Sequence, residues 1–119
     1  MYKTTITEIG DLVPDFQEER LLILFGPKAT PELRSISVIH DHVDEKKNVI
    51  VKGGKLTIAG KEYIIGEVGS AANANFNELG HVSIYFRDGE NEVLPGAIIA
   101  KPNEWPDFKV GEEIIFSNK

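Results

Sequence analysis

The lengths and spacing of the apolar segments most strongly limit the fold of this chain. The segments are short, they end at glycine, proline or charged residues, and several alternate apolar with polar residues. Such alternation puts every second side chain on one face of a β-strand. Two alternating stretches, residues 55–58 and 61–68, flank Ala59-Gly60 and predict a β-hairpin. The pattern therefore indicates an all-β fold.

Further strands are predicted on both sides of this hairpin. With frequent glycine breaks between them, they indicate a small closed or partly open barrel of about 6–8 short strands. The predicted strands are residues 2–9, 21–25, 36–43, 81–86, 92–100 and 114–116, and residues 49–51 are expected to resume the sheet.

One or two short helices accompany the strands. Thr30 is a candidate N-cap with Pro31 at the first helical position, which predicts a helical turn or two before the strand that follows. Residues 70–79 have helical character, with Ser70 as the expected cap and Gly80 as the expected end.

Length and composition limit the class of function. The 119 residues fit a single domain, residues 1–119. No cysteine is present, so disulfides, thiolate metal sites and a cysteine nucleophile are excluded. The net charge of −6 disfavours binding to nucleic acid. No apolar run approaches the roughly 20 residues of a membrane span, and we expect a cytoplasmic protein.

The candidate chemistry lies in the three histidines. His40 and His42 are two residues apart on a predicted strand, so both imidazoles point the same way, roughly 6.6 Å apart along the strand. His81 begins another predicted strand, and alternation puts it on the face opposite the inward apolar residues of that strand. Alternation points Asp41, which stands between the first two, away from them.

Three readings of this histidine cluster are open from the residues alone. Neutral imidazole is a nucleophile near pH 7 and can accept and release a phosphoryl group without a cofactor. Three histidines are also the ligand number of a catalytic zinc site, so a metal-binding barrel enzyme is an alternative. The third is a noncatalytic barrel that binds a small ligand or another protein.

A family resemblance favours the first reading. Val38-Ile39-His40-Asp41-His42 and the block from Val68-Gly69-Ser70 through Glu78-Leu79-Gly80-His81-Val82 resemble the glucitol/sorbitol-specific IIA component of the bacterial phosphoenolpyruvate-dependent sugar phosphotransferase system. The opening Tyr2-Lys3-Thr4-Thr5-Ile6 and the later Leu94-Pro95-Gly96 are similar too, so the likeness covers nearly the whole chain.

The resemblance implies a phosphoryl relay on a small β-barrel. Phosphorylated HPr, the histidine-containing phosphocarrier, would donate to His40, and His40 would pass the group to the IIB part of a membrane sugar transporter. Contact with the membrane would be transient, through the IIB and IIC components, and neither a metal nor another cofactor is expected.

Other residues are expected to support the phosphoryl group without carrying it. His42 and His81 would donate hydrogen bonds to its oxygens. Gly69 and Ser70 would present the N-terminus of the predicted helix to it, where free N–H groups and the helix dipole favour an anion.

Overall fold

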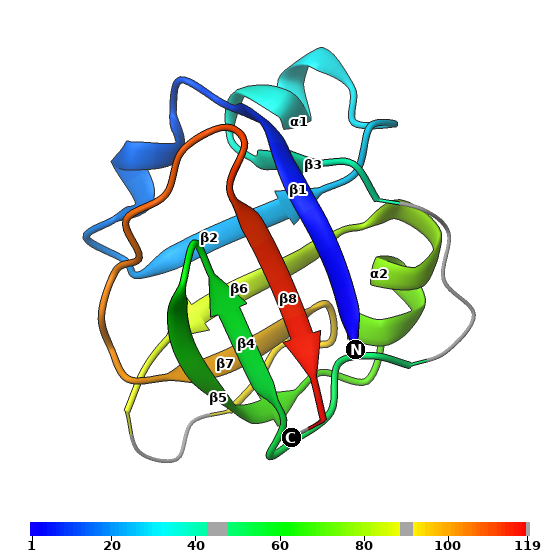
Figure 1. Cartoon of the computed structure of the whole chain (residues 1–119), viewed down its shortest axis with the longest axis vertical. Coiled ribbons are helices and arrows are strands. Elements are labelled where there is room, and N and C mark those ends of the chain that lie inside the picture. Colours follow the sequence, from blue (N-terminus) through cyan, green and yellow to red (C-terminus); the bar gives the residue numbers. More distant parts are fainter. Residues whose placement is uncertain (43–47, 89–91, 119) are drawn as a thin grey trace.

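The computed structural model describes residues 1–42, 48–88 and 92–118, and its strands form a closed barrel (Figure 1). Around the barrel the strands follow the order β1-β3-β2-β6-β7-β5-β4-β8. The all-β prediction is thus confirmed, with a closed rather than an open barrel. The strands are β1 (Tyr2–Ile9), β2 (Leu21–Phe25), β3 (Val38–His40), β4 (Lys55–Ile58), β5 (Lys61–Val68), β6 (Val82–Phe86), β7 (Ala97–Lys101) and β8 (Glu113–Ser117).

The barrel mixes antiparallel and parallel pairs. β2 runs parallel to β3 and β6 parallel to β7, and the other neighbours are antiparallel. A parallel pair needs a crossover connection. The α1 helix (Pro31–Ser35) lies in the crossover from β2 to β3. A 3-10 helix, η1 (Val13–Phe16), precedes β2, and α2 (Ala72–Leu79) connects β5 to β6.

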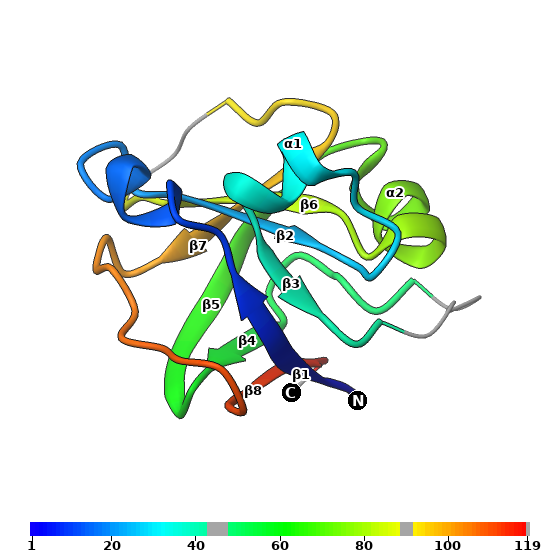
Figure 2. The same cartoon turned by 90° about the horizontal axis from the view of Figure 1, so that it is seen from above.

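The main core fills the barrel, and α2 contributes to it from one end. Phe76 of α2 is fully buried and packs edge-on against Phe116 of β8, with ring centroids 5.1 Å apart. Figure 1 shows α2 next to the start of β1, and Figure 2 shows the helix at one edge of the barrel. The ring of Phe76 lies 5.2 Å from that of Tyr2 on β1, measured between centroids. The helix therefore closes the barrel end at which β1 begins.

Several local predictions are confirmed. The strands at residues 2–9 and 21–25 and both arms of the hairpin have the predicted bounds. Thr30 caps α1, its side chain accepting a hydrogen bond from the Leu33 N–H at 3.5 Å, and Pro31 is the first helical residue. Gly80 ends α2 in the left-handed conformation with φ +66°.

Four predictions about the elements are wrong. Of the segment 92–100, only the part after the Pro95-Gly96 turn is a strand, β7, which begins at Ala97. The strand expected over residues 36–43 is only Val38–His40 within the described chain, because Ile36 and Ser37 still bond to the last turn of α1. Residues 49–51 form no strand, since the Asn73 amide takes both backbone groups of Ile50. Ser70 is not the cap of α2: Ala71 is, with no side-chain bond. The sequence also predicts a turn at Asp88-Gly89 and a solvated loop over residues 44–48, and both extend outside the described residues.

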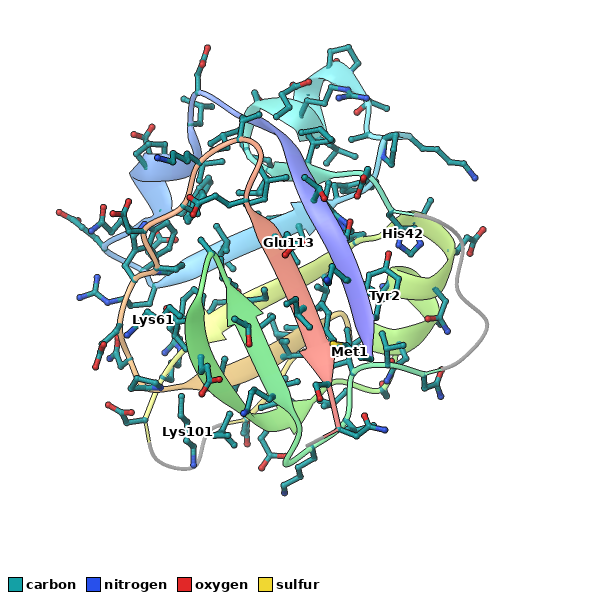
Figure 3. The ribbon with its side chains drawn as sticks, in the orientation of Figure 1. Met1, Tyr2, His42, Lys61, Lys101 and Glu113 are labelled. Carbon is teal, nitrogen blue, oxygen red and sulfur yellow. The ribbon has the colours of Figure 1, made fainter. Side chains whose placement is uncertain are left out.

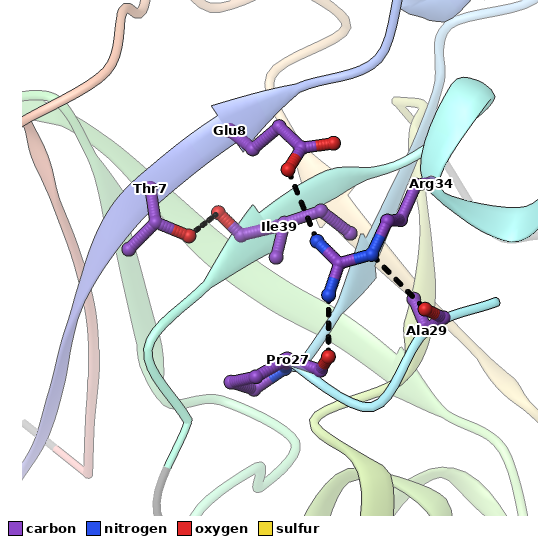
Figure 4. A network of polar contacts seen from close by, with 6 residues as sticks. All are labelled: Thr7, Glu8, Pro27, Ala29, Arg34 and Ile39. Atoms are coloured by element: carbon purple, nitrogen blue, oxygen red, sulfur yellow. Dashed lines mark hydrogen bonds and ion pairs between the residues drawn. The ribbon is translucent and has the colours of Figure 1, made fainter. Parts of the chain in front are cut away.

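Arg34 holds the α1 crossover against β1 (Figure 4). Its guanidinium donates to the Ala29 carbonyl at 3.0 Å, to the Pro27 carbonyl, and to the Glu8 carboxylate at 3.0 Å. Thr7 is next to Glu8 on β1, and its hydroxyl donates to the Ile39 carbonyl of β3 at 3.3 Å. These bonds join the crossover to the two strands that carry the site described below.

Replacing Phe76 by alanine should lower the free energy of unfolding by about 3–5 kcal/mol, because it removes a fully buried aromatic ring and leaves a cavity. Urea denaturation measures this loss. Leu94→Ala is the control, since Leu94 is 63% exposed and its truncation should change stability by less than about 0.5 kcal/mol. Equal losses in the two variants would contradict the assigned packing of α2.

Candidate phosphoryl-transfer site

His40 ends β3 and points into the barrel. Its side chain is 0% exposed, and its ring stacks on Phe76 with centroids 5.7 Å apart and planes 12° apart. Both ring nitrogens have partners: Nε2 lies 2.8 Å from the Gly80 carbonyl oxygen and Nδ1 lies 2.9 Å from the Thr4 hydroxyl. A carbonyl oxygen can only accept, so Nε2 carries a hydrogen in this arrangement.

The environment keeps the His40 imidazole neutral at pH 7. Burial lowers the pKa of His40 from 6.5 to about 4, because the charged form loses its hydration, and the hydrogen bond to Gly80 opposes this in part. A neutral imidazole has one nitrogen lone pair, which a nucleophile requires.

Asp41 reaches His40 through Thr4. The Thr4 hydroxyl, itself buried, donates to the Asp41 carboxylate at 2.8 Å, and the Thr5 backbone N–H donates to the same oxygen at 2.7 Å. These bonds lower the pKa of Asp41, with the bond from Thr5 as the largest cause. The expectation that Asp41 points away from the ring holds for direct contact, but Thr4 joins the two groups.

His42 lies beside His40, as the spacing predicted, with ring centroids 5.7 Å apart. Its Nε2 donates to the Asn77 carbonyl at 3.0 Å, so Nδ1 accepts from the Tyr2 hydroxyl when the ring is neutral. Figure 3 shows the Tyr2 and His42 side chains next to each other at the start of β1. His42 is only partly buried, so it lies between His40 and the surface.

His81 lies on the other face of the barrel wall. Its ring packs on Phe25 at 4.5 Å, and Phe25 belongs with Ala29 and Ile39 to a small cluster separate from the main core. Burial lowers the pKa of His81, opposed by a hydrogen bond to the Leu24 backbone, and its Nδ1 has no partner. The three histidines therefore do not converge on one point.

Gly69 and Ser70 are at the far end of α2 from His40. The last turn of α2, not the first, contacts the imidazole, through the Gly80 carbonyl. A helix of this length is roughly 12 Å long at about 1.5 Å per residue. A Cβ atom added at Gly69 would meet the carbonyl oxygens of Leu94 and Pro95 rather than the site. Ser70 is exposed. The predicted helix N-terminus at the phosphoryl group is therefore wrong.

Sequence reasoning missed Thr4 and Gly80 as site residues. Thr4 shares the inward face of β1 with Tyr2 and Ile6, and a hydroxyl between two buried apolar residues is a signal of a buried polar partner. Gly80 was recognised only as a helix end. Nothing local shows that its carbonyl bonds to a histidine 40 residues away.

The described residues contain no cluster of three or more histidine, cysteine or acidic side chains that could hold a metal ion. The three-histidine metal site also fails on geometry, because His81 lies across the wall from His40. Among the helices that the structure describes, none is both long and apolar enough to span a membrane.

The barrel matches a solved structure, which defines the class of protein. The crystal structure of a phosphotransferase system IIA component from Enterococcus faecalis V583 superposes with a TM-score of 0.89. It is 29% identical in sequence, and the match covers 98% of this chain and 99% of that one. The fold is thus that of a phosphotransferase system IIA component.

Sequence comparison gives the particular family. A family model described as the glucitol/sorbitol-specific IIA component of the phosphotransferase system matches residues 1–115. The glucitol/sorbitol-specific EIIA components of Shigella flexneri and Escherichia coli K12 are each 37% identical over 99 residues, which is 82% of this chain and 79% of theirs. The chain therefore belongs to the glucitol/sorbitol-specific IIA family, whose members are transferases of the phosphotransferase system.

The buried His40 predicts a specific pH dependence of stability. Between pH 6.5 and about 4 the unfolded chain binds a proton at His40 and the folded chain does not, so stability falls as pH falls. This loss amounts to roughly 3 kcal/mol at about 1.4 kcal/mol per pH unit. Urea titrations at several pH values measure it.

His40→Gln is the comparison, because glutamine has no titrating imidazole. The variant should lose less stability than the wild type between pH 6.5 and 4, by roughly the same 3 kcal/mol. Every other titratable group is present in both proteins, so the difference between the two pH curves reports the change at His40. If the free energy of unfolding fell equally in the two proteins between pH 6.5 and 4, the lowered pKa of His40 would be contradicted.

Proposed function

We propose that this protein is a phosphoryl relay for glucitol/sorbitol uptake, with His40 as the residue that carries the group. Phosphorylated HPr is the donor, and the IIB component of the IIB/IIC membrane transporter is the acceptor. The protein works in the cytoplasm and meets the membrane only through that transporter. The observation that carries the proposal is a neutral imidazole at the end of β3, with a hydrogen-bond partner at each ring nitrogen. This histidine is the first of the His40-Asp41-His42 pair, the position that the family resemblance implies for the phosphoryl group.

In the first transfer, bonds form and break only between phosphorus and the two imidazoles. The free nitrogen lone pair of His40 forms a bond to phosphorus while the bond from phosphorus to the donor imidazole breaks, and its electron pair returns to the donor. Such in-line transfer depends on positioning and on stabilisation of charge. In the onward step a nucleophilic group of IIB forms a bond to phosphorus while the bond from phosphorus to His40 breaks, and the electron pair of that bond returns to the His40 nitrogen.

The burial of His40 sets a condition on this transfer. The ring is 0% exposed, so the donor can reach it only after its surroundings move. Attack by Nε2 also requires that the hydrogen bond to the Gly80 carbonyl break. We propose that docking of the partner separates the last turn of α2 from the end of β3.

His42 supports the reaction from between His40 and the surface. With its ring 5.7 Å from that of His40, His42 can donate from Nε2 to a phosphoryl oxygen if it leaves the Asn77 carbonyl. The partner would present a basic docking face, which the net charge of −6 favours.

His40→Gln should abolish the relay, because glutamine keeps a hydrogen-bonding side chain but cannot carry the phosphoryl group. The wild type, incubated with phosphoenolpyruvate, enzyme I and HPr, should gain an acid-labile, base-stable phosphoryl group. Mass spectrometry under alkaline conditions measures it. Phosphorylation of the variant at the wild-type rate would rule out His40 as the acceptor.

The positions of the other two histidines predict unequal effects. His42→Gln should slow phosphorylation by about 100-fold to 1000-fold if His42 stabilises developing charge. His81→Gln should change the rate no more than a few-fold, because His81 lies on the other face of the wall. Quench-flow rates from phospho-HPr measure both, with circular dichroism as the folding control. A phosphorylation rate lowered by more than a few-fold in His81→Gln would contradict the placement of His81 on the other face of the barrel wall.

A further inference from the structure

We propose that Thr4 and Asp41 are positioning residues for the transfer: they hold a hydrogen on Nδ1 of His40 in the phosphorylated state, so that Nε2 is the nitrogen that carries the phosphoryl group. The proposal rests on the proposed function of His40. It adds two residues whose contribution the histidine pattern does not reveal.

Four groups form one chain of hydrogen bonds through the imidazole. The Gly80 carbonyl lies 2.8 Å from Nε2, and the Thr4 hydroxyl lies 2.9 Å from Nδ1 and 2.8 Å from the Asp41 carboxylate. The Thr4 and His40 side chains are buried, so water does not compete for the two contacts of the imidazole. The two ends of the chain, a carbonyl and a carboxylate, are both acceptors.

Counting hydrogens shows that the chain is not satisfied in the resting protein. Three contacts need three hydrogens, but the Thr4 hydroxyl supplies one and a neutral imidazole supplies one. One contact is therefore short of a hydrogen unless the imidazole is charged, and burial opposes that charge. Gly80 and the Thr4–Asp41 pair thus compete for the single ring hydrogen.

Phosphorylation on Nε2 resolves this competition. The attacking Nε2 must hold the lone pair, so the ring hydrogen is on Nδ1 and is donated to the Thr4 oxygen. The Thr4 hydroxyl then donates its own hydrogen to Asp41, and the Gly80 contact ends as phosphorus takes its place. The ring gains positive charge as the bond forms, and the Asp41 carboxylate stabilises that charge through Thr4.

The backbone fixes Asp41 in the position that this role requires. The Asp41 N–H donates to the Thr5 carbonyl at 3.0 Å, and the Thr5 N–H donates to the Asp41 carboxylate rather than to a backbone carbonyl. The side chain thereby replaces the next rung of the ladder between β1 and β3. The carboxylate is held beside Thr4 although Asp41 is exposed.

A purely structural role is the alternative, in which these bonds only complete the β1–β3 ladder. The two roles differ in what a substitution changes. A structural role affects the stability of the fold. A positioning role also affects the rate of phosphorylation and the distribution of the ring hydrogen between the two nitrogens.

Thr4→Val tests the proposal, because valine keeps the shape of threonine and loses the hydroxyl. Phosphorylation from phospho-HPr should slow by about 10-fold to 100-fold, the usual effect of losing one hydrogen bond to a charged group. Thr7→Val is the matched control: Thr7 is on the same strand and bonds to a β3 carbonyl, not to His40. The control should keep the wild-type rate.

Two further variants keep the test decisive if Thr4→Val folds poorly. Thr4→Ser retains the hydroxyl and should restore most of the rate. Asp41→Asn retains an oxygen that accepts from Thr4 and Thr5 but removes the charge, and it should slow transfer by about 10-fold. Urea titrations separate these rate effects from losses of stability.

Nitrogen-15 NMR of the imidazoles shows directly which ring nitrogen carries phosphorus and which carries hydrogen. In the phosphorylated wild type, the His40 signals should show phosphorus on Nε2 and hydrogen on Nδ1. Phosphorus on Nδ1, or wild-type rates in both Thr4→Val and Asp41→Asn, would overturn the proposal. A phosphoryl group found on His42 or His81 would instead overturn the proposed function of His40.

Discussion

The contact between the end of α2 and the end of β3 is the interaction on which the site depends. The His40 imidazole meets the Gly80 carbonyl at 2.8 Å, and Gly80 adopts φ +66°. A Cβ at this position would lie 2.8 Å from the Cβ of His42. Glycine is required here both by the left-handed backbone and by the close approach of a histidine. Through this one residue the helix end meets both His40 and His42.

The closed barrel explains why two polar residues can be held so deep. β1 pairs with β3 on one side and β8 on the other, and its inward residues Tyr2, Thr4 and Ile6 are buried inside the barrel. Thr4 on that face would be an unpaired buried hydroxyl without His40 and Asp41. The stacking of His40 on Phe76 adds an apolar neighbour from α2. The site is therefore built from segments that come together only when the barrel closes.

The parts of the fold that depend on local sequence could be predicted, and the parts that depend on tertiary contacts could not. The hairpin of β4 and β5 follows from alternation around Ala59-Gly60, and α1 from Thr30 and Pro31. β3 ends at His40 because the Thr5 N–H of β1 donates to the Asp41 side chain instead of a backbone carbonyl. Thr5 is 36 residues from Asp41 in the sequence, so local sequence cannot show this bond. The spacing of His40 and His42 places them together, and alternation in β6 predicts that His81 faces away from the buried Val82, Ile84 and Phe86. Alternation within one strand does not show that this face lies across the wall from His40, because that depends on how the strands pair.

The direction of α2 has a consequence for the chemistry of a relay. The C-terminal end of a helix carries partial negative charge, which favours cations and disfavours phosphate. At this end, the Gly80 and Asn77 carbonyls face the two imidazoles. The helix therefore favours imidazole N–H groups and a positive ring over a tightly bound phosphoryl group. A relay residue must give up what it receives, and strong stabilisation of the phosphorylated state would slow the second transfer. A helix end that stabilises charge on the ring, and does not itself bind the phosphoryl oxygens, is consistent with rapid exchange in both directions.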